Sequence, residues 1–345
     1  KNIGKVGISL GVGMSSLESL VGCVSKQSKI FETVEDVQKI KWDSNPAIPV
    51  PENGCYVGWY KEIQNKLIRD GWSEAEQSML DSHNEDFGKM PAVHCISDRK
   101  TNHIFPLEFY DKMNENGVFP LLRYHPYCPD FKMILDGKLD RELIILAQGA
   151  KEFGKPFFFV PFPEANIPSS HSHIHAWGKS SPKYFEKAWK YMRHIFEEEG
   201  ANENTVWGLH LLAVKDHLSF NWHDLDDSLF DWMGFTTYNI SREVGAYNSF
   251  NNMFNNAYHW AKNKHPDKPM ALFELGTSDT SRQSNWLKDA YKNIKKKSRI
   301  KLALYAEYYF GNPTNFHDRT YFTKRGKATY KEIISDPYFI GSRFK

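Results

Sequence analysis

The sequence is poor in cysteine and almost balanced in charge, and each of these shortages excludes a class of protein. Its four cysteines fit no metal-ligand spacing and are too few for a disulfide scaffold. Lys and Arg number 44 against 42 Asp and Glu, so the net charge of +2 gives no reason to expect nucleic acid or an acidic membrane surface as a partner. The sequence also lacks a Gly-x-Ser-x-Gly nucleophile elbow and a phosphate-binding loop. Apart from the N-terminal segment, no stretch approaches the roughly 20 apolar residues of a membrane span.

The N-terminal segment has some features of an export signal. Lys1 and Lys5 precede a mostly apolar stretch, 6–17, and the Leu-Val-Gly-Cys of residues 20–23 resembles the lipobox at which bacterial lipoproteins are cleaved and acylated. Glu18 interrupts this pattern. Two interpretations stay open: an ordinary N-terminal arm, or a secreted or cell-surface protein whose only membrane attachment is a lipidated Cys23.

Residues 1–53 are therefore interpreted as an arm or signal followed by a linker. The linker prediction rests on residues 24–53, which are polar and end in a proline-rich run, 45–54. Aromatic residues make up 15% of the chain, which suits either a large core or a ligand site lined with flat rings. We expect residues 54–345 to form one catalytic domain.

Apolar runs alternate with helical patterns along this domain, as expected for a parallel sheet. Most runs are continuously apolar, which is typical of strands covered on both faces. The predicted strands are 55–60, 92–97, 118–125, 156–162, 206–212, 233–238, 270–275 and 301–308. Between the fourth and fifth strands, residues 182–199 carry apolar side chains three and four apart and predict a helix. Eight strands with crossover helices predict an α/β fold, a single (β/α)8 TIM barrel.

Two glutamates lie where such a barrel carries its chemistry, at the C-terminal ends of strands. Glu164 follows the fourth strand, and Glu274 lies near the end of the seventh. Either residue alone would be interpreted as an ion-pair partner or a helix cap. Together they face each other across a closed barrel, and two facing carboxyl groups can cleave a glycosidic bond if one is protonated and the other ionised.

Four stretches around these glutamates resemble glycoside hydrolase family 26, which is dominated by β-mannanases. The similarity covers roughly residues 54–340. It is best after the fourth strand, in Ala-Trp-Gly at 176–178 and in the helix and strand entry over 184–210. The family's His-Glu-Met-Asn motif aligns with Pro-Glu-Ala-Asn at 163–166, while 230–239 and 269–276 are similar to its sixth and seventh strands.

The resemblance implies a retaining hydrolase with specific roles for these residues. Glu164 would be the general acid/base and Glu274 the nucleophile. Tyr238 would orient the nucleophile, and Trp177 would stack on a sugar ring. Asn166, from the aligned motif, is included among the substrate-binding residues.

This sequence departs from the family pattern beside the acid. Pro161 and Pro163 occupy the positions of an Arg and a His that help shape the family's pocket, and proline donates no hydrogen bond. Either another side chain takes over, with Arg123 and His125 as candidates, or the substrate and the rate have changed. The mannan specificity of the family is therefore not assumed.

Other polar and aromatic residues follow the predicted strands. Tyr124 and His125 end the third strand and are expected to face the substrate, although either could be core. Trp222 follows the fifth strand and could border a sugar subsite. Three alternating histidines over 171–175 could bind a metal, but no carboxylate partner accompanies them, and we interpret them as hydrogen-bond donors. We expect no metal and no cofactor.

The sequence therefore predicts a retaining β-glycoside hydrolase, expected to be a monomer, whose partner is a polysaccharide or oligosaccharide and most readily a β-mannan. Two alternatives remain. One is a catalytically weakened carbohydrate-binding protein, which the two prolines favour. The other is a hydrolase of the same clan that acts on a different β-glycan.

Overall fold

The structure is a computed structural model, and it describes residues 41–61, 74–97, 105–126, 130–167, 182–213, 225–240, 248–308 and 320–343. The strands are β1 (Cys55–Lys61), β2 (Val93–Ser97), β3 (Phe119–Tyr124), β4 (Phe157–Pro161), β5 (Thr205–Leu212), β6 (Trp232–Asn239), β7 (Met270–Thr277), β8 (Ile300–Glu307) and β9 (Phe339–Ile340). The helices are α3 (Glu74–Phe87), α4 (Leu107–Glu115), α5 (Lys132–Leu135), α6 (Asp140–Phe153), α7 (Pro182–Glu198), the short 3-10 helix η7 (Asp227–Leu229), α8 (Phe250–Lys264), α9 (Gln283–Lys296) and α10 (Lys324–Ile334).

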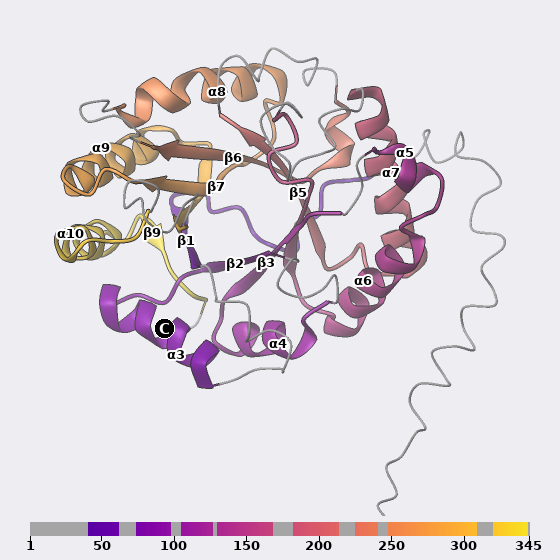
Figure 1. The fold of residues 1–345 in the computed structure, drawn as a ribbon, viewed down its shortest axis with the longest axis horizontal. Helices are drawn as coiled ribbons and strands as arrows, with labels where there is room; N and C mark the ends of the chain where they lie inside the picture. Colours follow the sequence, from indigo (N-terminus) through magenta and orange to yellow (C-terminus); the bar gives the residue numbers. More distant parts are fainter. Residues whose placement is uncertain are drawn as a thin grey trace, which may run out of the picture.

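Strands β1 to β8 form a closed parallel barrel. Each pairs with the next along the chain, and β8 and β2 both pair with β1. The helices surround the strands on the outside (Figure 1). The short strand β9 adds to β1, which the sequence did not predict. The predicted (β/α)8 fold is confirmed, and all eight predicted strands are present with ends shifted by at most two residues.

The pleat of each strand divides its side chains between two cores. Phe119 and Leu121 of β3 belong to the cluster that fills the barrel interior. Leu122 and Tyr124 of the same strand belong to the layer between the strands and the helices. Since both faces are covered, every residue of β3 is buried, which explains the continuous apolar run.

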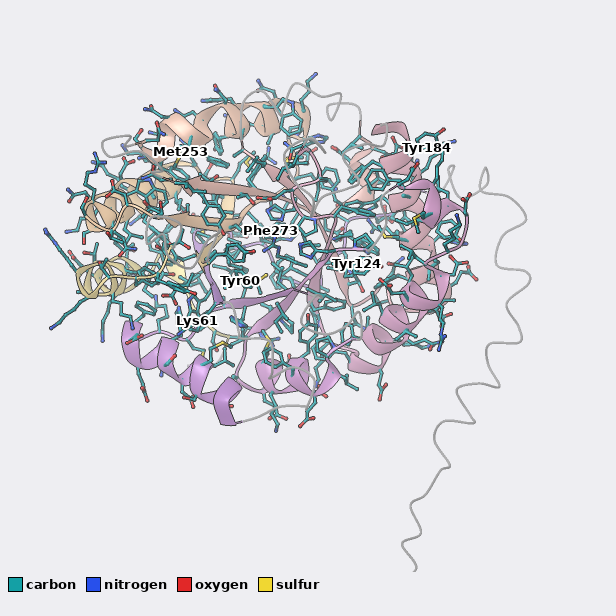
Figure 2. All side chains as sticks on the ribbon, viewed as in Figure 1. Tyr60, Lys61, Tyr124, Tyr184, Met253 and Phe273 are labelled. Carbon is teal, nitrogen blue, oxygen red and sulfur yellow. The ribbon has the colours of Figure 1, made fainter. Side chains whose placement is uncertain are left out.

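Phe273 fills the middle of the barrel, where Figure 2 labels it. Gly208 of β5 and Gly234 of β6 leave the room it needs. A Cβ atom at Gly234 would lie 1.8 Å from the ring of Phe273, closer than any real contact allows. Glycine is therefore required on β6 by the close approach of this side chain.

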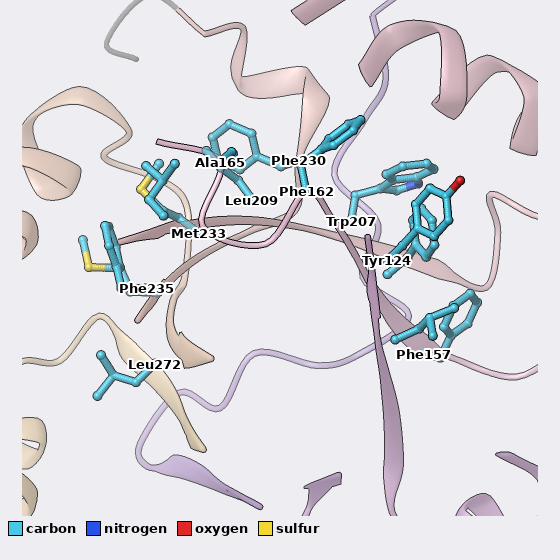
Figure 3. Close-up of a cluster of buried hydrophobic side chains, with 14 of the residues drawn as sticks. Tyr124, Phe157, Phe162, Ala165, Trp207, Leu209, Phe230, Met233, Phe235 and Leu272 are labelled. Carbon is cyan, nitrogen blue, oxygen red and sulfur yellow. The ribbon is translucent and has the colours of Figure 1, made fainter. Parts of the chain in front are cut away.

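The outer layer is dominated by aromatic rings. Phe159 of β4 lies 5.1 Å from Trp207 of β5 and 4.9 Å from Phe196 of α7, measured between ring centroids. Figure 3 shows Trp207 and Tyr124 in this layer, on the side of the strands away from the barrel interior. Much of the high aromatic content is therefore structural, as one of the two interpretations from composition proposed.

The end of the expected linker packs on the barrel. Ile48 is 1% exposed and belongs to the interior cluster. The side chain of Asn45 donates hydrogen bonds to the carbonyl oxygens of Asn202 and Thr205, at 2.8 and 3.0 Å. Its backbone N–H donates to Asp231 at 2.7 Å. These contacts lie at the N-terminal ends of β5 and β6, so residues 45–48 are packed against this end of the barrel.

Two histidines are buried beside Trp59, in the layer under α3. The rings of His83 and His94 lie 4.7 and 5.8 Å from that of Trp59. Burial lowers the pKa of His83 to about 3 and that of His94 to about 4. A histidine in the unfolded chain has a pKa of about 6.5, so below that pH the unfolded state binds protons that the folded state excludes.

Acid is therefore expected to destabilise the fold before the carboxylates titrate. Between pH 7 and pH 5, each buried histidine is expected to remove up to about 2 kcal/mol from the free energy of unfolding, measured by urea denaturation. His94→Leu should flatten this dependence, while His259→Leu, at an exposed position on α8, should leave it unchanged. If the free energy of unfolding falls equally between pH 7 and pH 5 in wild type and in His94→Leu, buried His94 is not a cause of the acid sensitivity.

Candidate active site

Glu164 lies in a tight turn directly after β4. Two residues of this turn have left-handed backbone conformations, Phe162 with φ of 52° and Glu164 with φ of 57°. Such conformations are costly for residues other than glycine and persist where the surroundings hold them. Here the N–H of Phe162 donates to the carbonyl of Tyr124 at 3.0 Å, and the N–H of Ala165 donates to the carbonyl of His210 at 3.0 Å. The turn is thus fixed to β3 and β5, on either side of β4.

The two prolines belong to this turn. Pro161 is the last residue of β4 and pairs with Tyr124 of β3. Pro163 lies between the two left-handed residues, and its ring fixes the φ angle between them. Phe162 turns its ring into the outer layer, 5.0 Å from the ring of Phe131. The prolines therefore restrict the backbone that carries Glu164.

Glu274 reaches the barrel interior through an irregularity in β7. The register between β6 and β7 passes from Phe235 opposite Leu272 to Thr236 opposite Glu274, which leaves Phe273 as an extra residue. An extra residue breaks the alternation of a strand and redirects the side chain that follows. As a result, Phe273 fills the core, while Glu274 contacts Arg123 of β3 across the barrel and Tyr238 of the neighbouring β6.

Both carboxylate oxygens of Glu274 are held. Arg123 of β3 approaches Oε1 through Nη1 at 2.5 Å, and both side chains are less than a tenth exposed. The hydroxyl of Tyr238 of β6 donates to Oε2 at 2.6 Å. Burial and the neighbouring Glu274 raise the pKa of Tyr238 well above its usual value, so this residue stays a proton donor. The predicted neighbour Tyr238 is therefore in contact with Glu274.

The two carboxyl groups have different electrostatic surroundings. Burial, followed by the charge of Glu274, raises the pKa of Glu164 to about 7, although a hydrogen bond from Thr236 and the charge of Arg123 oppose this. Burial lowers the pKa of Arg123, but Glu274 outweighs it and the net direction is upward. Arg123 therefore remains charged beside Glu274. Near neutral pH, Glu164 can hold a proton while Glu274 has a cationic partner, as an acid and a nucleophile require.

Tyr124 does not contact this site. Its side chain is fully buried in the outer layer, where its hydroxyl donates a hydrogen bond to Glu142 of α6 and its ring stacks on Phe159. The pleat explains this, since Arg123 and Tyr124 are adjacent and must face opposite sides of the strand. The expectation that Tyr124 faces the substrate is wrong, and Arg123 faces the barrel interior instead.

Asn166, predicted to bind substrate, makes two hydrogen bonds to the backbone of Leu212 on β5. Its amide donates to the carbonyl of Leu212 at 2.9 Å, and its Oδ1 accepts from the N–H of Leu212 at 2.6 Å. Asn166 is 4% exposed, so both ends of its amide are used to bind the turn to β5. It positions Glu164 through the backbone.

Of the remaining predicted residues, the structure describes only His125. His125 is buried directly after β3, at the same end of the barrel as Glu164. Trp177, Trp222 and the histidines of 171–175 lie outside the described residues.

Among the residues that the structure describes, no group of three or more His, Cys, Asp or Glu is arranged to hold a metal ion. No helix in the described ranges is long and apolar enough to cross a bilayer.

Three further residues near the glutamates were not predicted from the sequence. Thr236 and His210 are joined by a hydrogen bond of 2.8 Å on adjacent strands β5 and β6. The ring of Tyr60, at the end of β1, lies 5.7 Å from the guanidinium of Arg123. All three occupy inward positions of their strands, and counting pleat positions back from the strand ends would have identified them.

Comparisons with known proteins show a likeness in fold. No family model matches the chain. The catalytic domain of a family 26 endo-β-1,4-mannanase from Bacillus sp. JAMB-750 has a TM-score of 0.63 at 17% identity, over 84% of this chain and 87% of that one. A family 26 β-mannanase from Bacteroides ovatus has a TM-score of 0.60 at 15% identity, over 90% and 93%. These solved structures carry the barrel of the family that the sequence motifs resemble.

Two further proteins extend the comparison. A β-mannanase from a symbiotic protist of the termite Reticulitermes speratus, solved with a gluco-manno-oligosaccharide, has a TM-score of 0.59 at 14% identity, over 84% and 89%. Endoglucanase H of Acetivibrio thermocellus is 24% identical over 235 residues, which is 65% of this chain. The matched part is only 25% of that protein's length.

Proposed function

We propose that this protein is a retaining β-glycoside hydrolase that cleaves a β-linked polysaccharide or oligosaccharide. One observation carries the proposal: Glu164, in the turn after β4, has a raised pKa, and Glu274, in the second half of β7, is paired with the cation of Arg123. The likeness to solved mannanases and to a curated endoglucanase supports it.

In the proposed first step, Glu164 donates its proton to the glycosidic oxygen and Glu274 attacks C1 of the sugar. The C1–oxygen bond breaks, the leaving sugar departs with the proton, and C1 becomes bonded to Glu274. In the second step, water attacks C1, Glu164 takes the proton of that water, and Glu274 is released. Arg123 and Tyr238 hold the two oxygens of Glu274 throughout, so that the attacking atom is already oriented.

β-1,4-mannan is the first substrate class to consider, because the solved structures of similar fold include several mannanases. A β-glucan comes second, because the curated relative is an endoglucanase and one mannanase binds a glucose-containing oligosaccharide. An extracellular location, through secretion or through acylation at Cys23, would bring the protein to such polymers and stays a prediction.

A non-hydrolytic carbohydrate-binding protein is the second candidate, favoured by the loss of the family's Arg and His at Pro161 and Pro163. The ion pair between Arg123 and Glu274 weakens this alternative. The guanidinium of Arg123 on β3 lies beside Glu274, so a positive charge is present there although β4 carries proline and no arginine.

Incubation with β-mannan, glucomannan, xylan and β-glucan tests the proposal by the release of reducing ends. We expect release from mannan or glucomannan, with β-glucan as the next best substrate. NMR of the first product should show the β anomer, as double displacement requires. An α anomer would contradict the retaining mechanism, and binding without release from any of the four glycans would support the binding protein.

A further inference from the structure

The arginine beside the nucleophile lies over the ring of Tyr60, the penultimate residue of β1. The guanidinium carbon of Arg123 is 5.7 Å from the centroid of that ring, within the range of a cation–π contact. The same guanidinium forms the ion pair with Glu274. Tyr60 belongs to the interior cluster, where Figure 2 labels it. Since Tyr60 is 4% exposed and Arg123 is 7% exposed, water does little to weaken their contact.

Hydrogen bonding alone does not fix the orientation of Arg123. Its Nη1 faces Glu274, at one edge of the guanidinium. Its buried Nε has no hydrogen-bond partner in the part of the chain that the structure describes. An aromatic ring against the face of a planar guanidinium restricts its rotation. The direction in which Arg123 meets Glu274 therefore depends on Tyr60.

Tyr60 is itself supported from β8. The ring of Tyr308, directly after β8, stacks on that of Tyr60 with 6.0 Å between the centroids and 25° between the planes. The backbone N–H of Tyr308 donates to the hydroxyl of Thr320 at 2.8 Å. The carbonyl of Tyr308 accepts from the N–H of Thr320 at 3.0 Å. The backbone that carries the supporting ring is thus bound at two points.

The ring of Tyr60 attracts Arg123 through its face and not through a charge. Burial raises the pKa of Tyr60 well above its usual value, although the charge of Arg123 opposes this. The hydroxyl therefore keeps its proton, and the attraction comes from the negative face of a neutral ring. A phenylalanine ring has such a face too, so the contact does not require the hydroxyl.

We propose that Tyr60 is a positioning residue that orients Arg123 and, through it, the nucleophile Glu274. This inference rests on the proposed function, because the orientation of Glu274 affects a rate only if that residue attacks a sugar. A small misplacement of a reacting atom costs a large part of the rate. Tyr60 acts on the reacting group through Arg123, so its loss should change kcat and leave KM nearly unchanged.

The kinetics of four variants test this role. Tyr60→Leu is expected to lower kcat roughly 3- to 30-fold, the size of a buried cation–π contact, with KM within about twofold of wild type. Tyr60→Phe should keep the wild-type kcat. Tyr56→Leu removes a ring from another inward position of β1, away from Arg123, and should also keep it. When Arg123→Met is already present, adding Tyr60→Leu should change kcat by less than about twofold, because the contact no longer exists.

Two kinetic outcomes would overturn the proposal. An equal loss of kcat from Tyr60→Leu with and without Arg123→Met would show that Tyr60 acts by packing alone. A raised KM with an unchanged kcat in Tyr60→Leu would assign Tyr60 to substrate binding instead.

A fluorinated ring separates the face of Tyr60 from its shape. Pentafluorophenylalanine at position 60 fills nearly the same space as phenylalanine but withdraws the negative charge from the face of the ring. We expect it to lower kcat relative to Tyr60→Phe by about the factor seen in Tyr60→Leu. This variant also decides the question if Tyr60→Leu does not fold. Equal kcat values for the two ring variants would overturn the proposal.

NMR of the arginine side chains tests the contact without any substrate. Side-chain N–H protons of Arg123 that lie over the ring should resonate upfield of their usual position because of its ring current, and Arg123→Met identifies these signals. The upfield shift should persist in Tyr60→Phe and disappear in Tyr60→Leu. An unchanged shift in Tyr60→Leu would contradict the proposal. If wild type cleaves no glycan, the proposed function fails, while this measurement still decides whether Tyr60 holds Arg123.

Discussion

Glu274→Gln is expected to lower kcat/KM by at least about 10⁴-fold on every substrate that the wild-type protein cleaves. The amide has the shape of the carboxylate but cannot attack C1, so no glycosyl-enzyme forms. A good leaving group does not help this variant, because the missing step is the attack itself. The measurement is initial rates on a glycan and on a dinitrophenyl glycoside of the same sugar.

Glu164→Gln should give a different pattern on the same two substrates. On the glycan, the loss of proton donation is expected to cost roughly 10²- to 10⁴-fold. On the dinitrophenyl glycoside, the leaving group needs no proton, so the first step survives and a burst of dinitrophenol precedes slow turnover. The burst is the signature of an intermediate on Glu274 that waits for a general base.

Glu108→Gln, at an exposed position on α4, is the matched control for both exchanges and should leave the rates unchanged. A burst in Glu274→Gln, or equal losses of Glu164→Gln on both substrates, would reverse or remove the assigned roles. Full activity of either variant would refute the double-displacement mechanism.

The barrel could be predicted from local sequence because its strands are buried on both faces. Continuous apolar runs such as the one in β4 are typical of strands covered on both faces. Local pattern also located Glu164, since a charged residue that ends such a run lies where the strand leaves the core, whereas three buried residues of β7 follow Glu274. The resemblance to a known family then assigned Tyr238, whose contact with Glu274 the structure shows.

The environment of the glutamates could not be predicted, because it depends on pleat phase and on distant strands. Tyr124 and Arg123 are neighbours, and a shift of one residue in the assumed phase exchanges the core residue for the site residue. The irregularity at Phe273 changes the phase of β7 for a reason that lies on β5 and β6, in the glycines that admit its ring. The hydrogen bonds between Asn166 and the backbone of Leu212 could not be predicted, because Leu212 is remote in sequence.

The surroundings of Pro161 and Pro163 could not be predicted either, because they also depend on distant strands. From the sequence, Pro161 and Pro163 are a loss of two polar side chains. In the structure, they restrict a turn in which two residues have positive φ, and the cation beside Glu274 is Arg123 of β3. A comparison position by position with the family cannot detect this ion pair, because Arg123 lies some forty positions before the prolines in the chain.

Arg123→Met is expected to disable the site and to destabilise the fold together. Methionine keeps most of the buried stem but leaves the carboxylate of Glu274 buried without its cation, which typically costs about 3–5 kcal/mol. A carboxylate in that situation takes up a proton and ceases to be a nucleophile. We therefore expect a loss of kcat/KM of at least about 10²-fold, along with a lower free energy of unfolding in urea.

Two further variants separate the charge from the packing of Arg123. Lys295→Met removes the cation of an exposed ion pair with Asp336 and should cost less than about 1 kcal/mol. The double variant Arg123→Met with Glu274→Gln removes both charges, so it should recover most of the stability lost by Arg123→Met while staying inactive. If the double variant is as unstable as the sum of its two single variants, Arg123 acts through packing alone. If Arg123→Met retains full activity, the ion pair with Glu274 does not replace the cation that the family places on β4.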